Sequence, residues 1–160
     1  MKQIAWWTEA IILIISFNPA HARGAELVSI TEIRPLIEWV ETRTNLMLLP
    51  RPKIFVSSEA LSKLTDAVDS AESQNHQRIA AYRDGVILIN EDYWHPGNIA
   101  DESVVVHELV HYAQDVGGLH YACSNLREEE AYRMQNMFLL EHGERAFLDE
   151  ADMDRLAVCH

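Results

Sequence analysis

The first half of the chain carries apolar residues at helical spacing, followed by a short strand pattern. One segment has its i, i+3, i+4 and i+7 positions occupied by Ile33, Leu36, Ile37 and Val40. This stripe predicts an amphipathic helix over residues 32–43, with Thr31 as its N-cap. The β-branched and aromatic run Lys53–Val56 predicts a strand. Residues 58–68 predict a second, short helix, and the polar stretch Ser70–Gln77 predicts a loop.

A β-hairpin is indicated in the middle of the chain. Residues 78–82 and 86–90 are largely apolar and flank Arg83-Asp84-Gly85. An Asp-Gly pair between two apolar runs favours a tight hairpin turn. Four consecutive apolar residues make Val86–Ile89 the most strand-like segment of the sequence.

Helices dominate the pattern after the hairpin. They are expected at residues 99–115, 125–141 and 153–158, with a loop over residues 91–98 before the first. Gly117-Gly118 and Gly143 follow the first two and are typical of helix C-termini. The 160 residues are 48% hydrophobic, which suffices for one core, and no Gly/Ser-rich linker divides them. The sequence therefore predicts a single α+β domain.

The N-terminus resembles an export signal rather than part of this domain. Lys2 precedes an apolar run over residues 10–17, and Ala20-His21-Ala22 has the small-residue pattern of a cleavage site. We expect residues 1–22 to be a signal peptide and residues 23–160 to be the mature domain. The product would be exported, periplasmic or extracellular, with no stable membrane span after cleavage.

Net charge and cysteine content narrow the function classes further. The formal charge is -12, so the clustered Lys/Arg surplus that binds nucleic acid or an anionic membrane is missing. Only Cys123 and Cys159 are present, and in an oxidising compartment they would pair. Neither belongs to a C-x-x-C motif, so a redox motif or a cysteine zinc knuckle is not supported. Nothing in the sequence indicates an oligomer.

The segment that carries candidate chemistry is His107-Glu108-Leu109-Val110-His111, which matches H-E-x-x-H inside a predicted helix. Residues four apart project from the same face of a helix, so the two imidazoles can bind one metal ion from a rigid backbone. The apolar residues around them are those of a buried helix, and burial would exclude water from the site. The pattern therefore predicts a metal site at His107 and His111.

A catalytic zinc usually has three protein ligands and one open position. The acidic triplet Glu128-Glu129-Glu130 begins the next helix. At 100° per residue, Glu128 lies about 40° from the centre of the apolar face, whereas Glu129 and Glu130 lie more than about 100° away. We expect Glu128 to be the third ligand, with Glu130 as the alternative, and the other acids to face solvent. Zinc is the ion expected from these ligand types, and manganese or iron stays open.

With these residues in place, the sequence resembles the gluzincin-type zinc metallopeptidases. They combine H-E-x-x-H with a downstream E-x-x-A, matched here by Glu128-Glu129-Glu130-Ala131, and the likeness extends to minimal zincin-like domains of small bacterial proteins. It implies that His107, His111 and Glu128 bind zinc and that Glu108 is the general base. It further implies that residues 86–90 form the sheet-edge strand along which an extended substrate lies.

The sequence departs from this family in two ways. In several gluzincins an Asp four residues after the ligand Glu orients a zinc-binding His, but this position is Tyr132. The groups that orient the ligands must therefore differ. A dedicated C-terminal subdomain is also missing, which predicts a shallow, open cleft.

The resemblance implies zinc-dependent hydrolysis of a peptide or protein. Zinc lowers the pKa of a bound water, and Glu108 is placed to accept its proton and pass it to the leaving amine. Tyr112, His120, Tyr121 and Tyr132 are candidate donors to the oxyanion. The alternative is a non-catalytic zinc-binding module that interacts with an envelope protein, and a third reading is a helical domain without metal.

Overall fold

The computed structural model describes residues 25–66 and 79–159. The predicted signal peptide over residues 1–22 and the predicted loop Ser70–Gln77 lie outside these ranges. The described elements are listed here in chain order: β1 (Glu26–Leu27), α1 (Ile30–Thr44), β2 (Lys53–Val56), α2 (Ser58–Asp66), β3 (Ala80–Arg83), β4 (Val86–Ile89), a 3-10 turn (Glu91–Tyr93), α3 (Ile99–Val116), α4 (Ser124–Glu141) and α5 (Glu150–Leu156). The predicted α+β class is confirmed.

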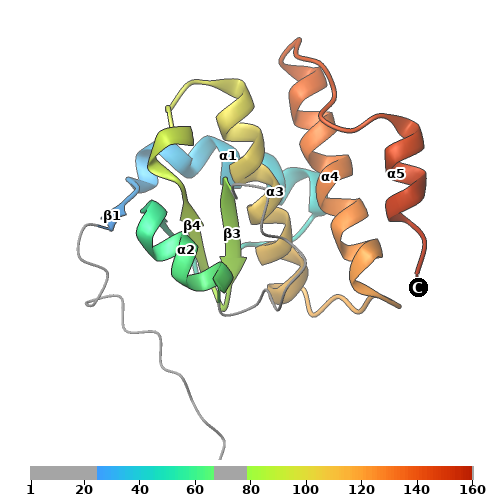
Figure 1. The fold of residues 1–160 in the computed structure, drawn as a ribbon, viewed down its shortest axis with the longest axis horizontal. Helices are drawn as coiled ribbons and strands as arrows, with labels where there is room; N and C mark the ends of the chain where they lie inside the picture. The colour runs from blue at the N-terminus through green and yellow to red at the C-terminus, as the bar shows by residue number, and fades with distance from the viewer. Residues whose placement is uncertain (1–24, 67–78, 160) are drawn as a thin grey trace, which may run out of the picture.

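The strands form one four-stranded sheet in the order β1-β2-β4-β3. Figure 1 shows β4 and β3 side by side. β3 and β4 are the predicted hairpin, antiparallel in the register Arg83↔Val86. Asp84 and Gly85 form its turn with φ of 50° and 81°, the left-handed region that Asp and Gly tolerate best. β2 pairs in parallel with β4, so β4 is an internal strand and β3 lies at the edge. The expectation that residues 86–90 are the edge strand is therefore wrong.

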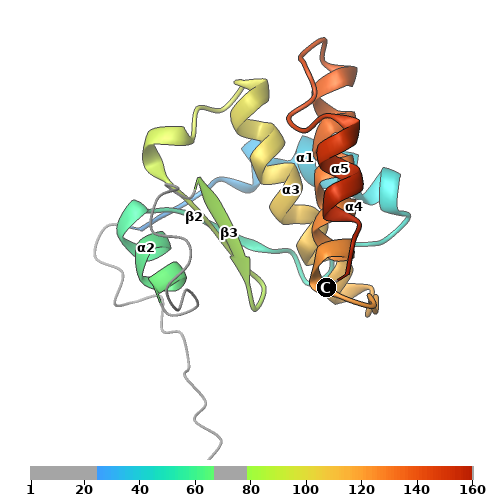
Figure 2. The same ribbon diagram turned by 45° about the vertical axis from the view of Figure 1, so that its right-hand side comes forward.

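Both faces of the sheet are covered, which explains the unbroken apolar run in β4. Leu88 packs on one face against Ala60 and Leu61 of α2. Ile87 and Ile89 point to the opposite face and join the main core. Figure 2 shows α2 and α3 on opposite sides of the strands. A strand buried on both sides has no polar face, so its sequence does not alternate.

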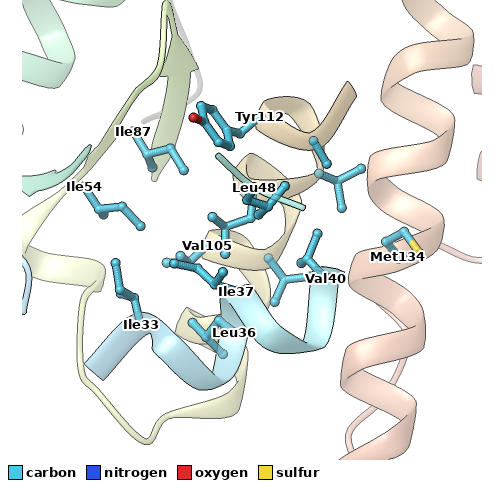
Figure 3. Packing of buried hydrophobic residues seen from close by; sticks show 14 of the residues in the cluster. Ile33, Leu36, Ile37, Val40, Leu48, Ile54, Ile87, Val105, Tyr112 and Met134 are labelled. Carbon is cyan, nitrogen blue, oxygen red and sulfur yellow. The ribbon is translucent and has the colours of Figure 1, made fainter. Parts of the chain in front are cut away.

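The main core lies between the sheet, α1 and α3. The predicted stripe of α1, Ile33 to Val40, is buried there (Figure 3). It meets Ile54 and Ile87 from the sheet and Val105 from α3. α3 is thus fixed in position by aliphatic packing on one side, which leaves its other side for α4.

The helix boundaries differ from the prediction at two N-termini. α1 begins at Ile30, because Ser29 and Glu32 form a capping box in which Ser29 Oγ accepts the Thr31 N–H. Thr31 is therefore a first-turn residue and not the N-cap. α5 spans Glu150–Leu156 instead of residues 153–158, because the Asp149 side chain caps it.

α4 packs against α3, and α5 packs on the outer side of α4 (Figure 1). The predicted Cys123–Cys159 pair is confirmed as a disulfide with a Cα–Cα distance of 5.7 Å. It joins the residue before α4 to the segment after α5. No helix within residues 25–66 and 79–159 has the length and hydrophobicity needed to cross a membrane.

Removing the disulfide should destabilise the domain without altering its site. The bond joins residues 36 apart, and closing a loop of this size contributes about 4 kcal/mol by restricting the unfolded chain. We expect the double variant Cys123→Ser, Cys159→Ser to lose about that much free energy of unfolding, as measured by urea denaturation. A double variant as stable as the disulfide-bonded parent would contradict a stabilising role for this bond.

Candidate metal centre

His107 and His111 lie one turn apart on α3, on the side that faces α4. Both are 7% exposed, and their Nε2 atoms are 3.1 Å apart. The helix is buried over most of its length from Ser103 to Gln114, so the imidazoles are attached to a rigid support. The sequence prediction that the two rings converge is confirmed.

Glu128 completes the cluster from α4. Its Oε2 lies 3.3 Å from His107 Nε2, and its Oε1 lies 3.3 Å from His111 Nε2. Ala131, one turn further along α4, is fully buried, and its small side chain allows the two helices to approach closely. The structure therefore brings together the three predicted ligands.

The spacing of these atoms suits a small tetrahedral ion. Ligand atoms at corners of a tetrahedron around zinc, with bonds of about 2.0–2.1 Å, lie about 3.3 Å apart. The two Nε2 atoms here are 3.1 Å apart, and each lies 3.3 Å from a different oxygen of the Glu128 carboxylate. With one ligand atom taken from each residue, the three atoms lie within 4.8 Å of one another. Two imidazole nitrogens and a carboxylate oxygen are also a donor set that zinc accepts readily.

The charges in the cluster stabilise one another. Burial alone would raise the pKa of Glu128, but the hydrogen bonds with His107 and His111 outweigh it and hold the pKa well below its usual range. Burial alone would lower the pKa of His111, but its contact with Glu128 reverses the effect and raises the pKa. A cation at this point would find a carboxylate that is already ionised.

Glu108 lies beside the cluster but not in it. Its side chain is buried, and burial raises the pKa of its carboxyl group. His107 and His111 act against this rise, as does a hydrogen bond from the Tyr82 backbone N–H. This bond ties the carboxylate to the edge strand β3.

The two histidines are held by different groups. His111 Nδ1 lies 2.9 Å from Gln114 Oε1. His107 Nδ1 is buried and makes no hydrogen bond within the described part of the chain. Tyr132, at the position of the gluzincin Asp, instead packs its ring 4.3 Å from the His107 ring. The ligands are therefore oriented by different groups from those of the gluzincins that the sequence resembles.

Glu130, the alternative ligand, does not reach the cluster and does not point into solvent. Its carboxylate accepts hydrogen bonds from Gln114 Nε2 and from the Tyr121 hydroxyl. The expectation that Glu130 faces solvent is therefore wrong. The projection compared Glu130 only with the apolar face of its own helix and could not place a polar partner on α3.

A cavity of about 420 Å³ opens over the cluster. It lies between β3, α3 and α4, and Phe147 from the α4–α5 connection closes one side. Phe147 is stacked on Tyr132 with a centroid distance of 5.8 Å and remains 57% exposed. The cavity is thus an open cleft with an aromatic rim, in line with the open cleft expected from the sequence.

The edge strand directs backbone groups into this cleft. In an antiparallel pair, residues that hydrogen-bond to the partner strand alternate with residues that do not. The Asn90 N–H donates to the Ile79 carbonyl, so Ala81 and Arg83 are the β3 residues whose backbone groups hydrogen-bond to β4. Ala80 and Tyr82 therefore direct their N–H and C=O groups away from β4. In the described residues no strand pairs with β3 on that side.

Of the four candidate oxyanion donors, Tyr132 alone lines the cavity. The Tyr112 hydroxyl donates to the Pro50 carbonyl, and the Tyr121 hydroxyl donates to Glu130. His120 is exposed outside the cavity lining. Three of the four candidates are thus directed elsewhere.

The sequence matches one known protein family. Residues 25–159 match the family described as a domain of unknown function, DUF6647. The chain belongs to the DUF6647 family. No curated protein and no solved structure matches the chain. For this DUF6647 domain the geometry of the cluster therefore has to carry the functional argument.

Sequence reasoning missed several parts of the DUF6647 site. The contact of Gln114 with His111 had a local signal, because Gln114 lies three residues after His111, a spacing at which helical side chains meet. The edge role of β3 was signalled by the unbroken apolar run of β4, which is typical of a central strand. No local signal pointed to Phe147, because its place depends on how α5 returns along α4.

Proposed function

We propose that this DUF6647 domain is a zinc-dependent hydrolase of peptide bonds. The observation that supports it best is the convergence of two imidazole nitrogens, 3.1 Å apart, with a carboxylate from a second helix that has an oxygen 3.3 Å from each of them. A second, buried carboxyl group, that of Glu108, lies beside these three groups. Three ligands and a separate base in an open cleft are the composition of a catalytic zinc site rather than a structural one.

His107, His111 and Glu128 would hold the ion. When bound, zinc lowers the pKa of a coordinated water and polarises a carbonyl group. The helix backbone fixes the two imidazoles, and Glu128 supplies the negative charge that balances part of the cation. The burial of both histidines limits water around the ligands and strengthens their electrostatic interaction with it.

Glu108 would act as the general base and then as the general acid. Its carboxylate is held by the Tyr82 N–H at the base of the cleft, between the ligand cluster and the edge strand. From there it can accept a proton from the attacking water and deliver it to the amine that leaves. The carboxylate starts and ends the cycle ionised.

The exposed edge of β3 would bind the substrate backbone. An extended peptide can add to a free strand edge through main-chain hydrogen bonds, with its side chains alternating to either side. The outward N–H and C=O of Ala80 are placed for this pairing next to the cluster. A substrate on this edge would present its peptide bond to Glu108, so peptides or unfolded protein segments fit the cleft best.

We place this activity outside the cytoplasm. The Cys123–Cys159 disulfide is consistent with an oxidising compartment, and the N-terminal pattern predicts export. The substrate would then be an exported peptide or protein.

Two measurements on purified mature chain test the proposal. We expect one zinc per chain by elemental analysis, and cleavage of a mixed peptide library that a chelator stops and added zinc restores. Zinc without cleavage would instead support the alternative, a zinc-binding module that interacts with an envelope protein. A chain that takes up no zinc would reject both.

A further inference from the structure

Gln114 is the most deeply buried polar side chain of α3, at 1% exposed. It lies one turn beyond His111 and contacts it directly. Building on the metal site proposed above, we infer that Gln114 and Glu130 are positioning residues that hold His111 in the one tautomer able to bind a metal through Nε2.

The orientation of the Gln114 amide follows from its partners. Its Nε2 donates to the Arg127 carbonyl at 3.0 Å and to Glu130 Oε2 at 2.9 Å. Neither of these oxygens can donate a hydrogen bond in return, so the amide nitrogen must face them. The amide oxygen therefore faces His111 Nδ1.

This orientation determines the tautomer of His111. An amide oxygen only accepts, so Nδ1, 2.9 Å away, must carry the hydrogen. With Nδ1 holding the hydrogen of a neutral imidazole, Nε2 is the atom that can offer a lone pair to a metal, and an incoming cation would replace the hydrogen that Nε2 shares with Glu128 in the metal-free chain. Nε2 is the atom that lies beside His107 and Glu128.

Arg127 is the group that would favour the opposite tautomer. Its Nε lies 3.4 Å from His111 Nδ1 and could donate to a bare nitrogen there. The guanidinium is also bound by Asp115, at 2.9 Å, and by the His111 carbonyl, at 3.2 Å. The contact with Gln114 is shorter by half an ångström, and it prevails only while Gln114 keeps its orientation.

Glu130 supplies that orientation and links it to the third ligand. Its carboxylate accepts hydrogen bonds from the Gln114 amide and from the hydroxyl of Tyr121, which lies in the α3–α4 connection. Glu130 also lies two residues after Glu128 on the same helix turn. The bond between Gln114 and Glu130 therefore ties the α3 turn that carries His111 to the α4 turn that carries Glu128.

The inference is tested by two readouts on the full mature chain. Long-range proton–nitrogen NMR of the metal-free protein reports which His111 nitrogen carries the hydrogen, and competition with a zinc chelator gives the zinc affinity. We expect Nδ1–H in the parent. Gln114→Met, which keeps the shape and removes the acceptor, should shift His111 toward Nε2–H and weaken zinc binding about 10- to 100-fold.

Matched variants separate positioning from general damage. Gln135→Met replaces another buried glutamine, which bonds to Ser103, and Glu129→Gln removes a neighbouring charge that pairs with Arg133. Both should keep zinc affinity within about twofold, far from the loss expected of an orienting partner. The double variant Gln114→Glu, Glu130→Gln exchanges the two groups. The carboxylate at position 114 can accept from His111 Nδ1, and the amide at position 130 can donate to that carboxylate. This variant should therefore bind zinc more tightly than Gln114→Met.

Retention of Nδ1–H and of parental zinc affinity in Gln114→Met would overturn the inference, as would an exchange variant no better than Gln114→Met. The tautomer is measured without metal. A parent that binds no zinc would therefore reject the proposed function, while the NMR result would still decide whether Gln114 sets the tautomer.

Discussion

Replacing Glu108 with glutamine is expected to abolish peptide hydrolysis while zinc stays bound. The amide matches the carboxylate in size and can still accept the Tyr82 N–H, but it cannot take up a proton. General base and acid catalysis contributes about 10²- to 10⁴-fold to a rate, so the loss should fall in that range or reach background. Hydrolysis of a fluorogenic peptide, together with zinc content, measures both parts.

The matched control is Glu102→Gln. Glu102 lies on the same helix, but its carboxylate bonds to the Gly97 N–H and is outside the cavity lining. This variant should hydrolyse peptide at the parental rate. Parental activity in Glu108→Gln would show that another group moves the proton, or that the activity belongs to a contaminant. Loss of zinc from Glu108→Gln would contradict the assignment of Glu108 as a residue that does not ligate.

The parts of the fold that could be predicted are those encoded by local periodicity. The α1 stripe, the β2 strand and the hairpin turn depend on residues close in sequence, and each lies where the pattern indicates. The parallel pairing of β2 with β4 depends on two segments about 30 residues apart. The hairpin alone therefore gave the wrong edge strand.

The candidate site shows the same division. His107, His111 and Glu128 were found because helical geometry fixes where their side chains project. Glu130 was misplaced because its partners, Gln114 and Tyr121, lie on other elements. A projection of one helix separates apolar from polar faces, but it cannot distinguish a polar side that meets solvent from one that meets a neighbouring helix.

Glu128 and Glu130 lie on the same helix turn but make different kinds of contact. Glu128 contacts both imidazoles, whereas Glu130 contacts only groups that orient one of them. Among the described residues, His107 has no such partner for its Nδ1, and the Tyr132 ring packs against the His107 ring instead. The ligand set therefore depends on polar support at His111 and on packing at His107, which makes the consequences of removing each acid distinguishable.

Replacing Glu128 with alanine is expected to remove most of the stabilisation that zinc gives to the fold. A ligand present at 1,000 times its Kd stabilises a protein by about 4 kcal/mol. Loss of a direct ligand should weaken binding by at least the roughly 100-fold that loss of an outer-shell partner can cost. At the same zinc concentration the gain would then fall to about 1.4 kcal/mol or less. Denaturation with and without zinc measures the difference.

The same experiment ranks the neighbouring acids. Glu129→Ala should keep the full zinc-dependent gain, because Glu129 pairs with Arg133, one turn further along α4, and not with the two histidines. Glu130→Ala should lose an intermediate part of it, since it removes the support for Gln114 and leaves all three ligands in place. A greater loss in Glu130→Ala than in Glu128→Ala would mean that the ion is bound by the other acid. Because the two carboxylates belong to one helix turn, this order distinguishes a ligand from its support.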